Sequence, residues 1–190
     1  MIASIIINAA IILINIVCSI RGYMLVKPPI KHFRYFTTLS NLLCAVSGCF
    51  VIALWAAKGA LPLWTVILKY AGTCSVTVTM LTVLFFLGPV SHEWKLLLSR
   101  EQLFLHAICP VMAIVSFLVF EKGPMPPWTI AIGVLPVILY GALYCKRVVF
   151  TEGDRKWEDF YGFNHNGKWA ISCGAMVIAG ALIAFALWAI

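Results

Sequence analysis

The chain has 190 residues, of which 63% are hydrophobic and 11% are charged, and its mean hydropathy is +0.99. This composition excludes a soluble globular domain, in which about a quarter of the residues are charged. The formal net charge of +7 does not indicate nucleic-acid binding, because the basic residues lie in short loops between apolar stretches, where they face anionic lipid headgroups.

Six apolar stretches are long enough to cross a bilayer. A hydrocarbon core of about 30 Å requires roughly 20 apolar residues, and the helix satisfies every backbone N–H and C=O within itself. We predict spans at Ile2–Ile20, Tyr35–Ala57, Leu63–Val90, Leu103–Phe120, Trp128–Cys145 and Trp169–Ile190. The sequence therefore predicts one all-α polytopic membrane domain over residues 1–190. The first stretch lacks a basic leading region and a small-residue cleavage site, so we interpret it as a retained helix.

Lys and Arg residues gather in alternate loops. Those after the first, third and fifth spans are Arg21, Lys27, Lys31, Arg34, Lys95, Arg100, Lys146, Arg147, Arg155, Lys156 and Lys168. The other two loops carry only Lys58 and Lys122. Because positive residues favour the cytoplasmic side, we predict that the three basic loops are cytoplasmic and that both termini are non-cytoplasmic.

The start of the second span carries a polar cluster. Thr37, Ser40 and Asn41 are spaced i, i+3 and i+4 and share one helix face, and Thr38 lies beside them. His106 lies about one turn inside the fourth span, which begins on the same side of the membrane. Polar groups inside spans tend to face the interior of the bundle. We therefore expect the hydroxyl and the imidazole to meet if the second and fourth spans are neighbours.

Such a pair suits nucleophilic acyl transfer. A Thr hydroxyl needs a base within hydrogen-bond reach, and His is the usual base near neutral pH. Ser40 or Asn41 could donate to the developing oxyanion or orient the imidazole. The alternative is that Thr37, Ser40 and Asn41 hydrogen-bond across helices and that His106 bonds a backbone carbonyl.

Two further groups of polar residues lie within or between spans. Ser75 and Thr79, followed by Thr82, form a stripe that either lines a substrate cavity or packs between helices. Lys69 is expected to snorkel to the outer surface, with binding of a substrate carboxylate as the alternative.

The apolar segment from Trp157 to Phe163 is expected to fold back over the cytoplasmic mouth, which places Tyr161 and Phe163 near Thr37 and His106. The seven cysteines show no CxxC spacing and are expected to pack as small hydrophobes. The acidic residues of the last loop match no ligand spacing, so no metal is predicted.

Three short motifs resemble one family. Residues 36–43, read FTTLSNLL, resemble the F-T-x-x-S-N-L opening of the second helix in a bacterial family of six-helix membrane proteins. That family is related to the androgen-induced intramembrane hydrolases of animals. Residues 103–110, LFLHAICP, are similar to its His-then-Pro helix, and residues 157–164, WEDFYGFN, stand where the family has an aromatic W-x-Y-P-F-L-like segment. The Pro of that segment is absent here.

The resemblance implies a cofactor-independent hydrolase of fatty acid esters of hydroxy fatty acids, with a Thr nucleophile and a His base. Alignment to F-T-x-x-S-N selects Thr37, whereas the spacing of the animal enzymes selects Thr38; Thr37 is preferred because it shares a face with Ser40 and Asn41. The resemblance implies a lipid or fatty-acyl substrate and the bacterial cytoplasmic membrane as location, and it leaves the oligomeric state open. We expect the acyl chain to lie between the second, third and fourth spans. The alternatives are a substrate-binding component of a transporter and a non-catalytic membrane scaffold.

Overall fold

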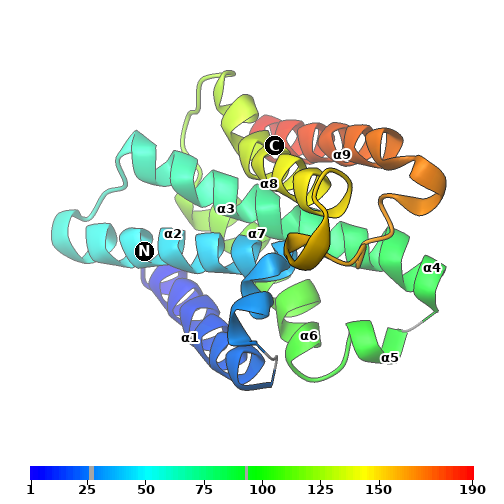
Figure 1. Cartoon of the computed structure of the whole chain (residues 1–190). Coiled ribbons are helices and arrows are strands. Elements are labelled where there is room, and N and C mark those ends of the chain that lie inside the picture. Colours follow the sequence, from blue (N-terminus) through cyan, green and yellow to red (C-terminus); the bar gives the residue numbers. More distant parts are fainter. Residues whose placement is uncertain (26–27, 93) are drawn as a thin grey trace.

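A computed structural model describes residues 1–25, 28–92 and 94–190, and these residues form an all-helical bundle (Figure 1). Six helical segments are long and apolar enough to cross a membrane, which confirms the predicted six-span, integral membrane architecture. The long helices are α1 (Ile2–Leu25), α2 (Phe36–Lys58), α3 (Leu63–Thr82), α8 (Thr129–Val148) and α9 (Trp169–Ala189). A π-helical turn η2 (Val83–Leu87) extends α3, and the fourth span is built from α6 (Glu101–Leu103), η3 (Phe104–Ile108), α7 (Cys109–Ser116) and η4 (Phe117–Glu121).

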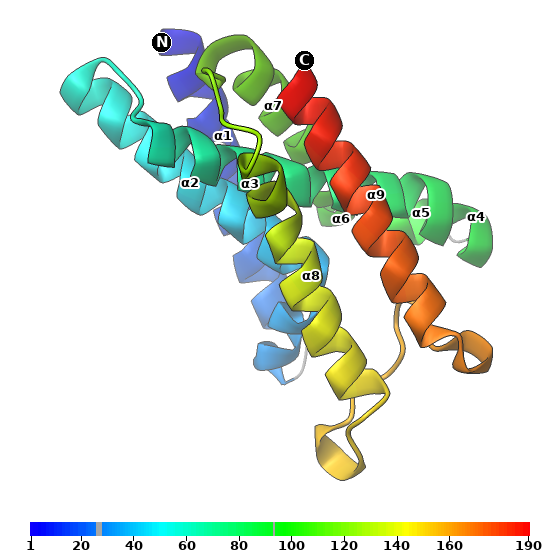
Figure 2. The same ribbon diagram turned by 90° about the horizontal axis from the view of Figure 1, so that it is seen from above.

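Short helices occupy the connections: η1 (Pro29–Arg34), α4 (Gly88–Ser91), α5 (Trp94–Leu97), η5 (Gly153–Arg155) and η6 (His165–Gly167). Four predicted boundaries move by two or more residues. The first helix continues past Ile20 to Leu25, the third membrane-crossing segment ends at Leu87, the fourth begins at Glu101, and the fifth continues past Cys145 to Val148. Lys27, counted above among the basic loop residues, lies outside the described residues. Both termini lie at the end of the bundle opposite the α8–α9 connection (Figure 2).

The most buried span is α3, which runs through the middle of the bundle. The helices α2, α7, α8 and α9 all pack against α3, and α1 packs across α2 and α7. Four hydroxyls of α3, those of Thr73, Ser75, Thr77 and Thr79, donate to carbonyls one turn earlier, for example Ser75 Oγ to Ala71 O at 2.8 Å, so most of the polar side chains of this central helix are paired within it. Gly72 lets α2 approach, because a Cβ there would stand 3.0 Å from the Cα of Cys44.

Lys69 is fully buried, and the prediction that it snorkels outward is wrong. Its Nζ donates to Asn8 Oδ1 at 2.6 Å and lies 3.8 Å from Glu121 Oε2. Glu121 Oε1 accepts from Ser4 Oγ at 2.7 Å, from Asn8 Nδ2 at 2.5 Å and from Ser116 Oγ at 2.5 Å. Opposite charge and these partners from α1, α7 and η4 compensate for the cost of burying the ammonium group.

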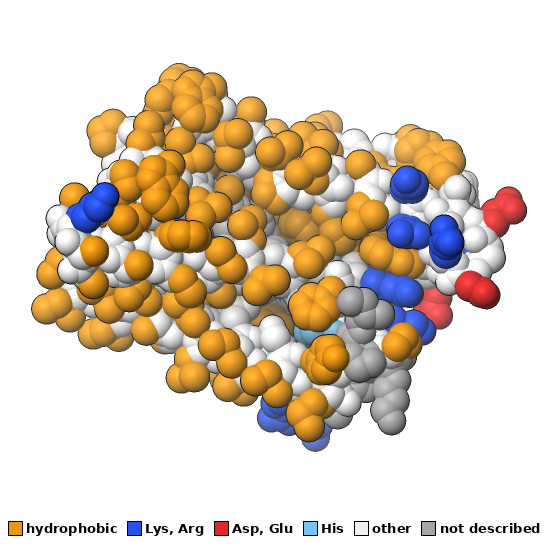
Figure 3. Space-filling model, turned by 60° about the vertical axis from the view of Figure 1, so that its left-hand side comes forward, with side chains coloured by type: hydrophobic (Ala, Val, Ile, Leu, Met, Phe, Trp, Pro, Cys, Tyr) orange, Lys and Arg blue, Asp and Glu red, His pale blue; other side chains and the backbone are white. Residues whose placement is uncertain are grey.

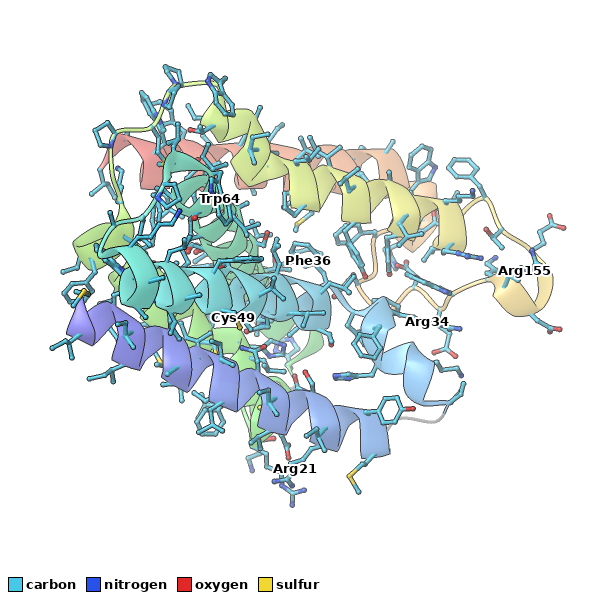
Figure 4. All side chains as sticks on the ribbon, turned by 90° about the vertical axis from the view of Figure 1, so that its left-hand side faces the viewer. Arg21, Arg34, Phe36, Cys49, Trp64 and Arg155 are labelled. Carbon is cyan, nitrogen blue, oxygen red and sulfur yellow. The ribbon has the colours of Figure 1, made fainter. Side chains whose placement is uncertain are left out.

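The outer surface suits a lipid environment. Hydrophobic side chains cover most of the face in Figure 3, and most of the visible Lys and Arg side chains gather toward one end. The same end carries Arg34 and Arg155 in Figure 4. All seven cysteines are free, and five of them are buried, in agreement with a packing role.

Candidate active site

Thr37 and His106 meet inside the bundle. Thr37 lies in the first turn of α2, and His106 lies in the π-helical turn η3 of the fourth span. Thr37 Oγ1 stands 3.3 Å from His106 Nε2, which is long for a hydrogen bond but within the reach of an unliganded acid–base pair. The imidazole is buried, while Thr37 is partly exposed. The expectation that the second and fourth spans touch at this depth is confirmed.

The π-helical turn explains how His106 is presented. In η3 the N–H of Cys109 donates to the carbonyl of Phe104, five residues earlier. The next bond of this register would join residue 110 to the carbonyl of Leu105, but residue 110 is Pro and has no N–H. Asn41 Nδ2 donates to that carbonyl instead, at 3.1 Å. The second and fourth spans are thus joined at the turn that carries His106.

Asn41 also forms a hydrogen bond within its own helix. Its Nδ2 donates to the carbonyl of Thr37 at 2.9 Å, so one amide group contacts the backbone of both α2 and η3. Ser40 Oγ contacts the same Thr37 carbonyl at 3.1 Å and Thr79 Oγ1 at 2.9 Å. Both side chains were predicted as oxyanion donors or as groups that orient the imidazole. The structure shows their donors directed at backbone carbonyls and at α3.

The aromatic segment after α8 folds back against the start of α2, as predicted. Tyr161 Oη accepts the N–H of Phe36 at 2.9 Å, and the N–H of Tyr161 donates to Tyr144 Oη at 3.0 Å. Phe36 is the first residue of α2, so its N–H has no partner within the helix. Tyr161 therefore caps α2 one residue before Thr37.

Burial raises the pKa of Tyr161 to about 12, despite opposing hydrogen bonds from the backbone of Phe36 and from the side chain of Tyr140, and from the backbone and side chain of Thr37. The phenol consequently keeps its proton throughout the neutral and moderately alkaline range. A half-buried phenol that keeps its proton and contacts the Thr37 side chain is able to donate a hydrogen bond to an oxygen that gains negative charge.

A largely apolar cavity lies beside Thr37. With its opening it encloses about 480 Å³ and is lined by α2, α3, η2, α8, α9 and the aromatic segment. The residues that line it are Phe36, Thr37, Thr79, Thr82, Val83, Leu87, Val137, Tyr140, Gly141, Tyr161, Phe163 and Met176. The cavity is thus lined by the second, third, fifth and sixth spans, whereas the expected position of an acyl chain between the second, third and fourth spans stays a prediction.

The cavity separates the predicted substrate residues into two groups. Thr79, Tyr161 and Phe163 line it. Ser75 does not, because its side chain is fully buried and its hydroxyl donates to Ala71 O. Thr38, unlike the adjacent Thr37, does not line the cavity, and its side chain is buried.

Sequence reasoning missed the contribution of α8 and α9. Tyr140 lines the cavity and donates its hydroxyl to Arg34 O at 2.6 Å, and Met176 closes the side formed by α9. Tyr140 and Tyr144 stand at i and i+4 on α8, with stacked rings whose centroids are 6.0 Å apart. That aromatic pair in a mostly aliphatic span was the available signal for a helix facing the aromatic segment.

The chain matches no protein-family model, no curated protein and no solved structure.

Proposed function

We propose that the protein is an intramembrane hydrolase of lipid-type esters in which Thr37 is the nucleophile and His106 is the base. The observation that carries the proposal is the 3.3 Å approach of Thr37 Oγ1 to His106 Nε2 at the wall of an apolar cavity. A hydroxyl, an imidazole within its reach and an apolar cavity beside them are the features that this reaction requires.

In the proposed reaction, His106 Nε2 takes the proton of the Thr37 hydroxyl as Oγ1 attacks the ester carbonyl. The carbon–oxygen bond to the alcohol breaks, and His106 returns the proton to the leaving alkoxide. Water then gives a proton to His106 and attacks the acyl–Thr37 ester. The acid leaves, and Thr37 regains its proton from the imidazole. Each step moves one proton to or from His106 Nε2.

Tyr161 is the proposed oxyanion donor. Its hydroxyl lies beside Thr37, and its raised pKa keeps the proton in place when the carbonyl oxygen becomes negative. Asn41 and Ser40 act as positioning residues, since they hold the Thr37 carbonyl and tie it to η3 and α3. The predominantly apolar lining of the cavity favours a fatty-acyl chain as the part of the substrate that it holds.

The distribution of Lys and Arg supports a cytoplasmic position for the loops next to this site, in a bacterial cytoplasmic membrane. The F-T-x-x-S-N-L and His-then-Pro motifs support esters of hydroxy fatty acids as the substrate class, because Thr37 and His106, which occupy the reactive positions of these motifs, are the two groups that meet.

The test is labelling of the purified protein with a fluorophosphonate. Wild type and Thr37→Ser are expected to react, whereas Thr37→Ala and His106→Ala are not. Thr38→Ala is the matched control, because it removes the neighbouring hydroxyl from the same helical turn. Labelling that survives Thr37→Ala but is lost in Thr38→Ala would identify Thr38 as the nucleophile. A folded wild type that does not react would refute the hydrolase.

A further inference from the structure

A second hollow lies on the lipid-facing side of the site. It is a groove between α2 and α8, lined by Phe36, Leu39, Ser40, Leu43, Pro136, Leu139, Tyr140 and Leu143, and with its open side it measures about 570 Å³. All but two of these side chains lack a polar group. Both walls belong to membrane-spanning helices, so the groove faces the hydrocarbon core of the bilayer.

The groove and the Thr37 cavity share two residues. Phe36 and Tyr140 line both hollows, and their rings stand 5.0 Å apart between centroids. Figure 4 shows the labelled Phe36 in the space between α2 and α8. A hydrogen bond between Ser40, which lines the groove, and Thr79, which lines the cavity, joins α2 to α3 between the two hollows. These two rings therefore form the wall that separates the bilayer from the nucleophile.

The two rings are held differently. Tyr140 is fixed by its hydroxyl, which donates to Arg34 O at 2.6 Å. Phe36 has a fixed backbone, because its N–H donates to Tyr161, but its ring has no polar atom and is held by packing alone. A rotation of the Phe36 side chain would open the wall without breaking a hydrogen bond, and ring rotations of this kind require no movement of the helices.

We propose that the groove between α2 and α8 binds the hydrocarbon chain of a membrane lipid and that Phe36 is the gate through which that chain reaches Thr37. The inference rests on the proposed hydrolase function, since the gate leads to its nucleophile. The occupant follows from the location: a groove that opens into the bilayer and is lined by Leu39, Leu43, Leu139 and Leu143 meets acyl chains and no other ligand at comparable concentration.

The test compares two fluorophosphonates, one with an ethyl and one with a hexadecyl chain, on the full-length protein in phosphatidylcholine vesicles. Leu139→Trp fills the groove and is expected to slow the hexadecyl reaction by at least about tenfold, as a steric misfit in an apolar pocket does, while the ethyl reaction is unchanged. Phe36→Ala is expected to speed the hexadecyl reaction. Leu182→Trp is the matched control, because Leu182 on α9 is as exposed to lipid as Leu139, at 64% against 61%, and lies outside the groove.

If the wild type reacts and Leu139→Trp reacts with the hexadecyl probe at the same rate, the proposal that the chain enters through the groove past Phe36 is refuted. The proposed hydrolase function is not affected by that result. A wild type that reacts with neither probe would refute the hydrolase instead. In that case, photolabelling with a palmitic acid analogue that carries a diazirine at its chain end tests separately whether the groove binds a hydrocarbon chain. Labelled peptides from residues 36–43 and 136–143 would support chain binding, and labelling confined to α9 would refute it.

Discussion

Asn41 on α2 occupies the position of a backbone donor that the fourth span lacks. Its Nδ2 lies 3.1 Å from the Leu105 carbonyl, which Pro110 leaves without a partner in the π-helical register of η3. An amide side chain thus completes the hydrogen bonding of a neighbouring helix, one residue before the His106 imidazole. Apolar surroundings make an unpaired carbonyl costly there.

We expect Asn41→Ala to destabilise the protein by roughly 1–3 kcal/mol, because it leaves the buried carbonyl of Leu105 unpaired. Fluorophosphonate labelling should also slow, since η3 loses its link to α2. In the Pro110→Ala background residue 110 regains its N–H, so the same substitution should cost less. A double-mutant cycle of unfolding in mixed detergent micelles measures the coupling. Equal costs in both backgrounds would show that Asn41 does not substitute for the missing donor.

Tyr161→Phe is expected to lower the rate of fluorophosphonate labelling about a hundredfold, the typical effect of losing one oxyanion donor. Phe keeps the ring but removes the hydroxyl that lies beside Thr37 and accepts the Phe36 N–H. Tyr144→Phe is the matched control, because it removes a hydroxyl from the same aromatic cluster at a position that does not line the cavity. Comparable losses of labelling rate in the two variants would indicate that the substitutions disturb the packing of the aromatic cluster and that Tyr161 does not act as an oxyanion donor.

Lys69→Met and Glu121→Gln should each destabilise the protein by roughly 3–5 kcal/mol, because each leaves the other charge buried without its partner. The double variant should lose less than the sum of the two, since no unpaired charge remains. Thermal unfolding followed by circular dichroism in detergent tests this. Additive losses would mean that the 3.8 Å ion pair contributes no coupling and that the hydrogen bonds of each charged group to Asn8 dominate.

His32 makes stability depend on pH. Burial lowers the pKa of His32 below its ordinary value of 6.5, and an added Cβ at Gly22 of α1 would collide with its ring. The unfolded chain therefore binds a proton more readily than the folded one, so this contribution is present above the ordinary pKa and is lost as the pH falls through the lowered one. The melting temperature should drop between about pH 7.5 and about pH 5, on either side of the ordinary His pKa, and it should drop less in His32→Gln. An equal drop in both proteins would assign the effect to other groups.

The spans were predictable because apolar length is a local property of the sequence. Each predicted span corresponds to a helix, and the boundaries shift by only a few residues where polar residues such as Arg21 and Glu101 continue a helix and pair with each other. The common depth of Thr37 and His106 followed in the same way, from counting residues inward from the same side of the membrane.

Lateral arrangement was not predictable, because it depends on which helix faces which. Lys69 looked like a residue that reaches outward, since its partners lie 61 and 52 positions away in the chain, at Asn8 and Glu121. The contribution of α8 and α9 to the cavity was not expected for the same reason. Nothing in the sequence of α2 shows that α8, rather than α7, faces the Phe36 ring.

The cap that Tyr161 places on α2 has a consequence for biogenesis. Thr37 and His106 belong to the first four membrane-crossing segments, whereas Tyr161, Phe163 and Met176 are synthesised after the fifth. During translation Thr37 and His106 can meet while the start of α2 still lacks its acceptor and the cavity lacks a wall. The proposed reactive site is therefore complete only when the fifth and sixth helices have been inserted and the segment between them has folded back.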